Sequence, residues 1–196
     1  MDLKAELKNI KLIATDIDGT LLLNDGTIGL ETKKLIKQLS EKGIIFSLAT
    51  GRLHSAVKEL AEEISLNGPI ISLDGSLIRT FPDDKSLYEN FIRRKHVQRA
   101  IRFAEENLFN IVLCHSDEIY YTEQNTVIPE LLSKFGAIYK KVESYENYFD
   151  GTLELVLTSD MKAALRKVAE RFLFPYSLGC NVSFFRSMKR ENIYYL

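Results

Sequence analysis

Ile10-Lys-Leu-Ile-Ala-Thr15 is an apolar run, and Asp16-Ile-Asp-Gly-Thr20 follows it directly. The run predicts a buried strand that ends in two carboxylates one residue apart. In an extended backbone residues i and i+2 point the same way, so Asp16 and Asp18 can face one site, and Gly19 lets the chain turn sharply there. Two like charges this close need a cation, and Mg²⁺ suits them because it takes one or two carboxylates and leaves room for phosphate oxygens. The competing interpretation is an Asp-rich turn with only a capping role.

The residues that follow alternate between helical and strand patterns. The predicted order is a strand over residues 10–15, a helix around 35–39, a strand over 44–49, a helix over 53–64 and a strand over 70–73. Such alternation implies a parallel sheet with right-handed crossovers. Between the first strand and the first helix, Asn24-Asp-Gly26 lies between apolar flanks and predicts a short hairpin over residues 21–28.

Polar residues follow the predicted strands where each one ends. Asp16, Thr50 and Asp74-Gly75 all occupy such positions, and in open α/β sheets ligands bind at the carboxyl edge of the strands. Thr50 precedes Gly51-Arg52 and a helix, so a hydroxyl and backbone N–H groups at the helix start predict an anion site. Two other interpretations stay open: Thr50 as a plain N-cap, and Arg52 as the partner of a surface acid.

Residues 85–196 have a different pattern, typical of an α+β domain. The predicted elements are a strand over 87–91, a helix around 97–104, antiparallel strands over 110–114 and 118–122, a strand over 153–157, a helix over 161–172 and short strands over 182–186 and 193–196. We therefore expect an α/β protein: a partial Rossmann-like core of three parallel strands over residues 1–84, and an α+β cap domain over 85–196.

Composition narrows the class of protein. The 196 residues are 45% hydrophobic and 27% charged, with a formal net charge of −1, which is typical of a globular protein and argues against a nucleic-acid partner. No apolar stretch is long enough to span a bilayer, and the charged N-terminus does not resemble a signal peptide. The two cysteines suit neither a disulfide framework nor a zinc site. We expect a cytoplasmic protein with neither a nucleic-acid nor a membrane partner.

Three motifs resemble the N-terminal motifs of the haloacid dehalogenase-like hydrolases, most closely of the Cof-type branch with a large α/β cap. They are Asp16-Ile-Asp-Gly-Thr20, Leu48-Ala-Thr-Gly-Arg52 and Ile71-Ser-Leu-Asp-Gly75. The resemblance implies that Asp16 is the nucleophile and a magnesium ligand. It also implies that Asp18 is the general acid/base and a second ligand through its carbonyl. Thr50, Gly51 and Arg52 would then bind the phosphoryl group.

The sequence departs from the family pattern in two ways. Asp74-Gly75 stands where the family usually has Asn-Gly, which adds a negative charge near the phosphate. The family's later lysine and acidic stretch are not found before Leu196, so we expect the C-terminal half of the core to be absent. In that case residues 12–15 become an exposed apolar edge that favours self-association.

The function that these features predict is a Mg²⁺-dependent phosphoric monoester hydrolase. It would act on a small phosphorylated metabolite, such as a sugar phosphate, through an aspartyl-phosphate, with activity impaired in this form. The alternative is a non-catalytic remnant that keeps a metal and phosphate pocket. A receiver-like signalling domain fits less well, because its acidic pair normally lies apart from the phosphoacceptor.

Overall fold

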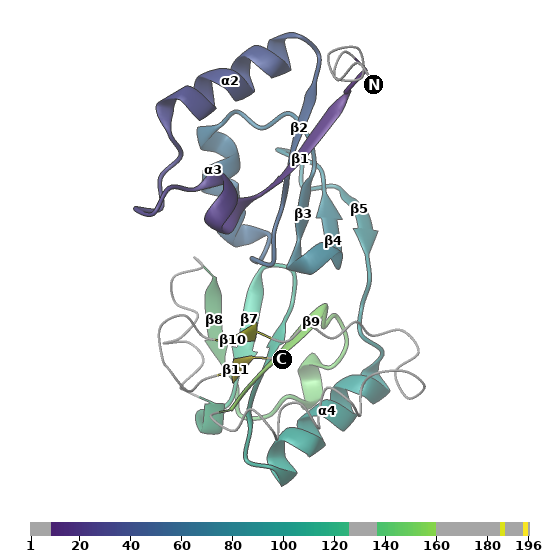
Figure 1. The fold of residues 1–196 in the computed structure, drawn as a ribbon. Coiled ribbons are helices and arrows are strands. Elements are labelled where there is room, and N and C mark those ends of the chain that lie inside the picture. The colour runs from purple at the N-terminus through teal and green to yellow at the C-terminus, as the bar shows by residue number, and fades with distance from the viewer. Residues whose placement is uncertain (1–8, 126–136, 160–184, 187–193, 196) are drawn as a thin grey trace, which may run out of the picture. The chain divides into compact units, whose positions relative to one another are not determined.

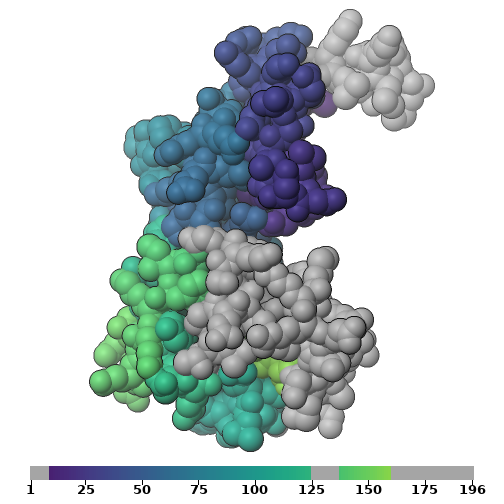
Figure 2. Space-filling model, turned by 90° about the vertical axis from the view of Figure 1, so that its left-hand side faces the viewer, coloured from purple at the N-terminus to yellow at the C-terminus, as the bar shows by residue number. Residues whose placement is uncertain are grey.

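A five-stranded sheet carries the polar residues that the sequence places at strand ends. The structure is a computed structural model and describes residues 9–125, 137–159, 185–186 and 194–195. It contains two compact units, Met1–Glu89 and Asn90–Leu196. Figure 2 shows the first in purple to blue and the described part of the second in teal to green.

The sheet of the first unit has the order β1-β2-β3-β4-β5. Its strands are β1 (Leu12–Asp16), β2 (Ile45–Ala49), β3 (Ile70–Ser72), β4 (Leu77–Arg79) and β5 (Ser86–Glu89). The first three are parallel, which confirms the predicted core, while β4 and β5 add antiparallel strands. β4 was not predicted. The strand predicted over residues 87–91, which the sequence assigned to the cap domain, is β5 of this sheet and lies in the first unit.

Two helices cover one face of the parallel strands (Figure 1). They are α2 (Leu30–Glu41) and α3 (Lys58–Glu63), and a short 3₁₀ turn over Ser55–Val57 precedes α3. The shared core of sheet and helices consists of Ile17, Leu21, Ile28, Ile36, Phe46, Leu48, Val57, Ala61, Ile64, Leu66 and Ile70. Both predicted helices are present, and the second begins later than expected because its first turn is 3₁₀.

The prediction of a hairpin over residues 21–28 is wrong. The chain turns there without forming strands: Leu23 N–H donates to Thr27 O at 2.8 Å, and Thr27 Oγ1 donates to Asp25 Oδ1 at 2.7 Å. Leu21 and Ile28 are both buried in the core instead of facing each other across a ladder. The apolar residues on either side of the turn therefore pack in the core and do not form paired strands.

Strand β1 lies at one edge of this sheet. Within the described residues it pairs only with β2, in the register Leu12↔Ile45 to Asp16↔Ala49. Ile13 packs against the helical core, whereas Leu12 and Ala14, on the opposite side of the strand, are exposed; the Leu12 side chain is 49% exposed.

The second unit contains a six-stranded sheet and α4 (Arg94–Glu106). In sheet order the strands are β10 (Phe185–Arg186), β11 (Tyr194–Tyr195), β9 (Glu154–Ser159), β6 (Asn110–Cys114), β7 (Glu118–Tyr121) and β8 (Ile138–Lys141). The predicted antiparallel pair β6–β7 is confirmed. β8, which runs parallel to β7, was missed, and the helix predicted over 161–172 lies outside the described residues.

The core of this second unit joins α4 to the strands. It includes Val97, Ala100, Ile101, Ala104, Phe109, Ile111, Leu113, Tyr145, Phe149 and Leu157. The Tyr145 hydroxyl donates to Ile111 O at 2.5 Å, so even this buried phenol has a partner. No helix in the described part of the chain is long and apolar enough to cross a membrane.

Candidate active site at the carboxyl edge of the sheet

Three neighbouring strands bring the predicted site residues to one edge of the sheet. Asp16 pairs with Ala49, and Ala49 pairs with Ile71, so the three parallel strands end level with one another. Beyond these ends, Thr50 N–H donates to Ile71 O at 2.9 Å, and Asp74 N–H donates to Thr50 O at 3.2 Å. The chain segments after β2 and β3 are therefore tied together at the carboxyl edge.

The first site element is the turn that follows β1. Asp16 ends the strand in an extended conformation, and Ile17–Leu21 form a π-type turn that is interrupted at Asp18 and Gly19. Gly19 has a φ of +79°, which explains why a glycine stands there. Asp16 and Asp18 are both exposed, whereas Ile17 between them is buried in the core and anchors the turn.

Arg52 and Asp18 form a bidentate ion pair. The Arg52 Nε atom donates to Asp18 Oδ2 at 2.8 Å, and Nη2 donates to Oδ1 at 2.6 Å. The Arg52 side chain is only 17% exposed, and that of Asp18 is 50% exposed. Two parallel charge-assisted bonds fix the plane of the carboxylate. The acid that pairs with Arg52 is thus one of the two acids of the candidate site.

Thr50 is buried, and its hydroxyl has a defined orientation. Arg52 N–H donates to Thr50 Oγ1 at 3.1 Å, so the oxygen accepts and its own hydrogen can be donated elsewhere. Helix α3 begins only at Lys58. Thr50 therefore closes a local turn and does not cap the helix, which settles the alternative that the sequence left open.

Asp74 lies against the backbone of Gly51. Leu73, Asp74 and Gly75 all have positive φ values, of 49°, 50° and 90°. A Cβ atom at position 51 would be 2.9 Å from Asp74 Oδ1, so a glycine leaves room for this carboxyl group. The extra negative charge of Asp74 is therefore held beside the Thr50–Arg52 segment.

The oxygen atoms at this edge are of the kind that Mg²⁺ binds. Asp16 ends the strand with an exposed carboxylate whose Oδ2 accepts a hydrogen bond from Thr20 Oγ1 at 3.3 Å. The described residues contain no group of three or more His, Cys, Asp or Glu side chains arranged to hold a metal. Mg²⁺ commonly uses only one or two carboxylates and keeps several waters, so the Asp16 carboxylate and the Asp18 carbonyl fit it in kind.

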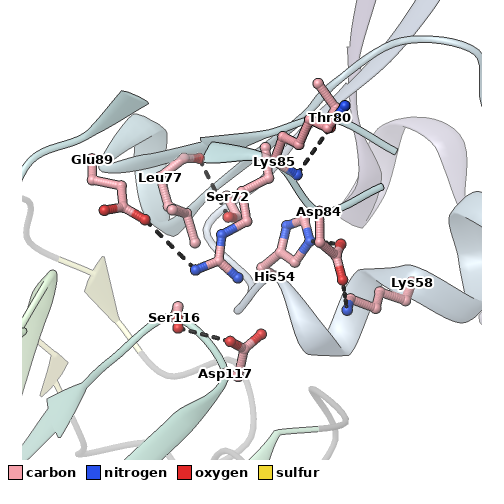
Figure 3. A network of polar contacts seen from close by, with 11 residues as sticks. His54, Lys58, Ser72, Leu77, Thr80, Asp84, Lys85, Glu89, Ser116 and Asp117 are labelled. Atoms are coloured by element: carbon pink, nitrogen blue, oxygen red, sulfur yellow. Dashed lines mark hydrogen bonds and ion pairs between the residues drawn. The ribbon is translucent and has the colours of Figure 1, made fainter. Parts of the chain in front are cut away.

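A polar cluster that the sequence did not predict lies beside the site. His54 Nε2 lies 2.9 Å from Asp84 Oδ1, and Lys58 Nζ contacts the other carboxylate oxygen of Asp84 (Figure 3). The hydrogen bond from Lys58, assisted by that from His54, holds the pKa of the Asp84 carboxyl below its usual range. No spacing rule links residues 54 and 84, because a strand pair separates them in the chain.

Known proteins share this arrangement of elements. A haloacid dehalogenase-like hydrolase from Bacteroides thetaiotaomicron superposes with a TM-score of 0.76 at 22% identity, over 95% of this chain and 70% of that one. A sugar phosphatase of HAD subclass IIB gives a TM-score of 0.69 at 18% identity, over 94% of this chain and 68% of the other. These similarities establish a Rossmann-type fold with a cap.

Relatives are also found by sequence. A 5-amino-6-(5-phospho-D-ribitylamino)uracil phosphatase from Bacillus subtilis is 40% identical over 78 residues, which is 40% of this chain and 31% of that protein. The matches span between 31% and 42% of the length of the first three curated relatives. A family model described as haloacid dehalogenase-like hydrolase matches residues 13–185, from β1 into the last strands of the second unit. With its paired aspartates at the end of β1, the chain belongs to the haloacid dehalogenase-like hydrolase family.

Proposed function

We propose that this protein is a Mg²⁺-dependent phosphatase that acts through an aspartyl-phosphate on Asp16. The main support is the placement of Asp16, Asp18 and the Thr50–Arg52 segment beyond level ends of adjacent parallel strands. This edge is where ligands bind in open α/β sheets. Bound Mg²⁺ would offset the negative charge shared by the carboxylates and the phosphate.

In the first step the Asp16 carboxylate attacks the phosphorus in line with the ester oxygen. A bond forms between an Asp16 oxygen and phosphorus, and the bond to the leaving oxygen breaks. Asp18, in its protonated form, gives its proton to that oxygen, so the product leaves as an alcohol. The Thr50 hydroxyl and nearby backbone N–H groups donate to the phosphoryl oxygens and stabilise the charge that develops there.

In the second step Asp18 takes a proton from a water molecule. The resulting hydroxide attacks the phosphorus, the acyl-phosphate bond breaks, and inorganic phosphate leaves with Asp16 restored as a carboxylate. Arg52 holds both oxygens of Asp18 in the structure. Arg52 therefore sets the orientation from which Asp18 gives and takes the proton.

For the substrate we propose a small phosphorylated metabolite such as a sugar phosphate. Two of the similar proteins are named for phosphorylated compounds of this size, a phosphoribitylamino-uracil and sugar phosphates. Such a substrate offers a phosphate group for the segment Thr50–Arg52 and hydroxyl groups for other polar side chains. The cytoplasm, where such metabolites occur, is the location that we propose.

We expect turnover by the 196-residue chain to be slow. Within the described residues the Arg52 guanidinium is engaged by Asp18, so it is already paired before a phosphoryl group binds. Electrostatic stabilisation of the transferring phosphoryl group is commonly a large part of catalysis. The same ion pair favours a second candidate function, a non-catalytic module that binds metal and phosphate without transferring it.

The hydrolysis of p-nitrophenyl phosphate, with and without Mg²⁺, distinguishes the two functions. We expect slow hydrolysis that requires Mg²⁺ and that falls to background in the Asp16→Asn variant. Asp83→Asn is a matched control, because the Asp83 side chain is exposed and pairs with exposed Lys85 at 3.6 Å. Binding of inorganic phosphate without any hydrolysis would favour the non-catalytic module, and equal hydrolysis by the Asp16→Asn variant would refute the proposed nucleophile.

A further inference from the structure

The segment from Thr50 to His54 carries the proposed phosphate-binding groups, and contacts at both of its ends hold it. Its first residues are bonded to β3 and the turn that follows: Thr50 N–H donates to Ile71 O at 2.9 Å, Asp74 N–H donates to Thr50 O at 3.2 Å, and Leu73 N–H donates to Arg52 O at 3.1 Å. At the far end of the segment the contact is made by a side chain. His54 Nε2 lies 2.9 Å from Asp84 Oδ1.

Asp84 is a firmly held partner for this contact. It lies in the loop between β4 and β5, where its N–H donates to Thr80 O at 3.2 Å and Lys85 N–H donates to Thr80 Oγ1 at 3.0 Å. Lys58, the first residue of α3, contacts its second oxygen. Figure 3 shows His54 and Lys58 both pointing at the Asp84 carboxyl group. One carboxylate therefore joins the segment, the helix and the loop.

His54 is an unusual residue for the place that it occupies. Its side chain is fully buried, and its Nδ1 atom has no hydrogen-bond partner within the described residues. A buried polar atom without a partner is unfavourable, and an apolar residue of similar size would avoid that cost. The side-chain hydrogen bond to Asp84 offsets this cost and fixes the ring.

We propose that His54 is a positioning residue for phosphate binding, and that Asp84 and Lys58 hold it in place. The inference rests on the proposed function of the Thr50–Arg52 segment. When the His54–Asp84 contact is lost, the end of the segment that leads into the 3₁₀ turn is free to shift. The Thr50 hydroxyl and the Arg52 guanidinium then lose their fixed positions.

Replacing His54 in the full chain tests this positioning. In His54→Leu the KM for p-nitrophenyl phosphate should rise roughly tenfold with a smaller change in kcat, because the segment holds the phosphate in both ground and transition states. In His54→Gln the side-chain amide can still donate to Asp84, so KM should return to within about threefold of the wild-type value. Asp83→Asn is the control and should not change KM.

Hydrogen exchange provides a readout that does not depend on activity. The amides of Leu73 and Asp74 are bonded to the segment, whereas the Phe46 amide is bonded to Asn67 Oδ1 at 2.7 Å. His54→Leu should speed exchange at Leu73 and Asp74 much more than at Phe46, and His54→Gln should not. Equal acceleration at all three amides, or none, would overturn the positioning role. If the wild type does not hydrolyse the substrate but the exchange pattern is as expected, the proposed function is refuted and the positioning role of His54 is still supported.

Discussion

At the scale of single residues, the site combines two acids with different surroundings. Asp16 is exposed at the end of β1 and accepts one long hydrogen bond from Thr20, whereas both oxygens of Asp18 accept from Arg52. A nucleophile needs an accessible oxygen, and an acid/base group needs a fixed orientation. The two aspartates differ in the way that their proposed roles require.

Asp74 offers a residue-scale prediction. Its carboxyl group lies against Gly51, and no ion pair with it is found among the residues that the structure describes. Asp74→Asn removes a negative charge without changing the size of the side chain, so the affinity for inorganic phosphate should rise, by about fivefold for roughly 1 kcal/mol. Isothermal titration in the presence of Mg²⁺ measures this. An unchanged or weaker affinity would show that the carboxylate faces away from the phosphate or accepts a hydrogen bond from the substrate.

At the scale of elements, β1 is an edge strand of the first unit that is available for pairing with another chain. Its outer edge has no partner in the described part of the chain, and Leu12 on its uncovered side is 49% exposed. An exposed apolar edge strand is a template for pairing with another strand. We therefore propose that the protein self-associates through β1.

Charge placed on this edge should weaken the association. Leu12→Lys adds an ammonium group to an already exposed position, so it should favour the monomer with little loss of stability. Leu108→Lys is the matched control, because Leu108 is 93% exposed in the second unit. Sedimentation velocity over a range of concentrations compares them. A wild type that stays monomeric throughout, or an equal effect of Leu108→Lys, would contradict the role of β1.

The second unit contains two histidines that should make its stability depend on pH. Burial lowers the pKa of His115, whose Nε2 lies 3.0 Å from Tyr148 O, and burial also lowers the pKa of His96 on α4. In the unfolded chain both imidazoles take up protons near pH 6.5, whereas in the folded unit they stay neutral down to a lower pH. The free energy of unfolding is therefore highest above about pH 7, where both histidines are neutral whether the chain is folded or unfolded. It decreases as the pH falls through 6.5 toward the lowered pKa values of the folded unit.

Urea unfolding followed by circular dichroism tests this dependence. The free energy of unfolding of the second unit should fall between pH 7.5 and 5.5 in the wild type. The double variant His96→Gln, His115→Gln should have a flatter profile, because it lacks both groups that take up protons preferentially on unfolding. A pH profile as steep in the double variant as in the wild type would assign the effect to other groups.

At the scale of the whole molecule, local sequence patterns predicted the three parallel strands and the helices of the first unit. Periodic apolar residues located these strands and α2, and the polar residues at the strand ends are the ones that the structure brings to one edge of the sheet as the candidate site. The sequence could not predict β4, because three residues carry too little periodicity, nor the absence of a hairpin after β1, where the apolar flanks enter the core. It also could not predict the contacts Arg52–Asp18 and His54–Asp84, because each joins residues that only the completed fold brings together.

The central claim is that Asp16 carries the phosphoryl group, and chemical trapping tests it most directly. The full chain is incubated with p-nitrophenyl phosphate and Mg²⁺ and treated with borohydride, which reduces an aspartyl-phosphate to homoserine, and its peptides are analysed by mass spectrometry. We expect homoserine at position 16 only, and none when either Mg²⁺ or the substrate is left out. Hydrolysis without any conversion at Asp16, or conversion at Asp18 or Asp74 instead, would contradict the proposed mechanism.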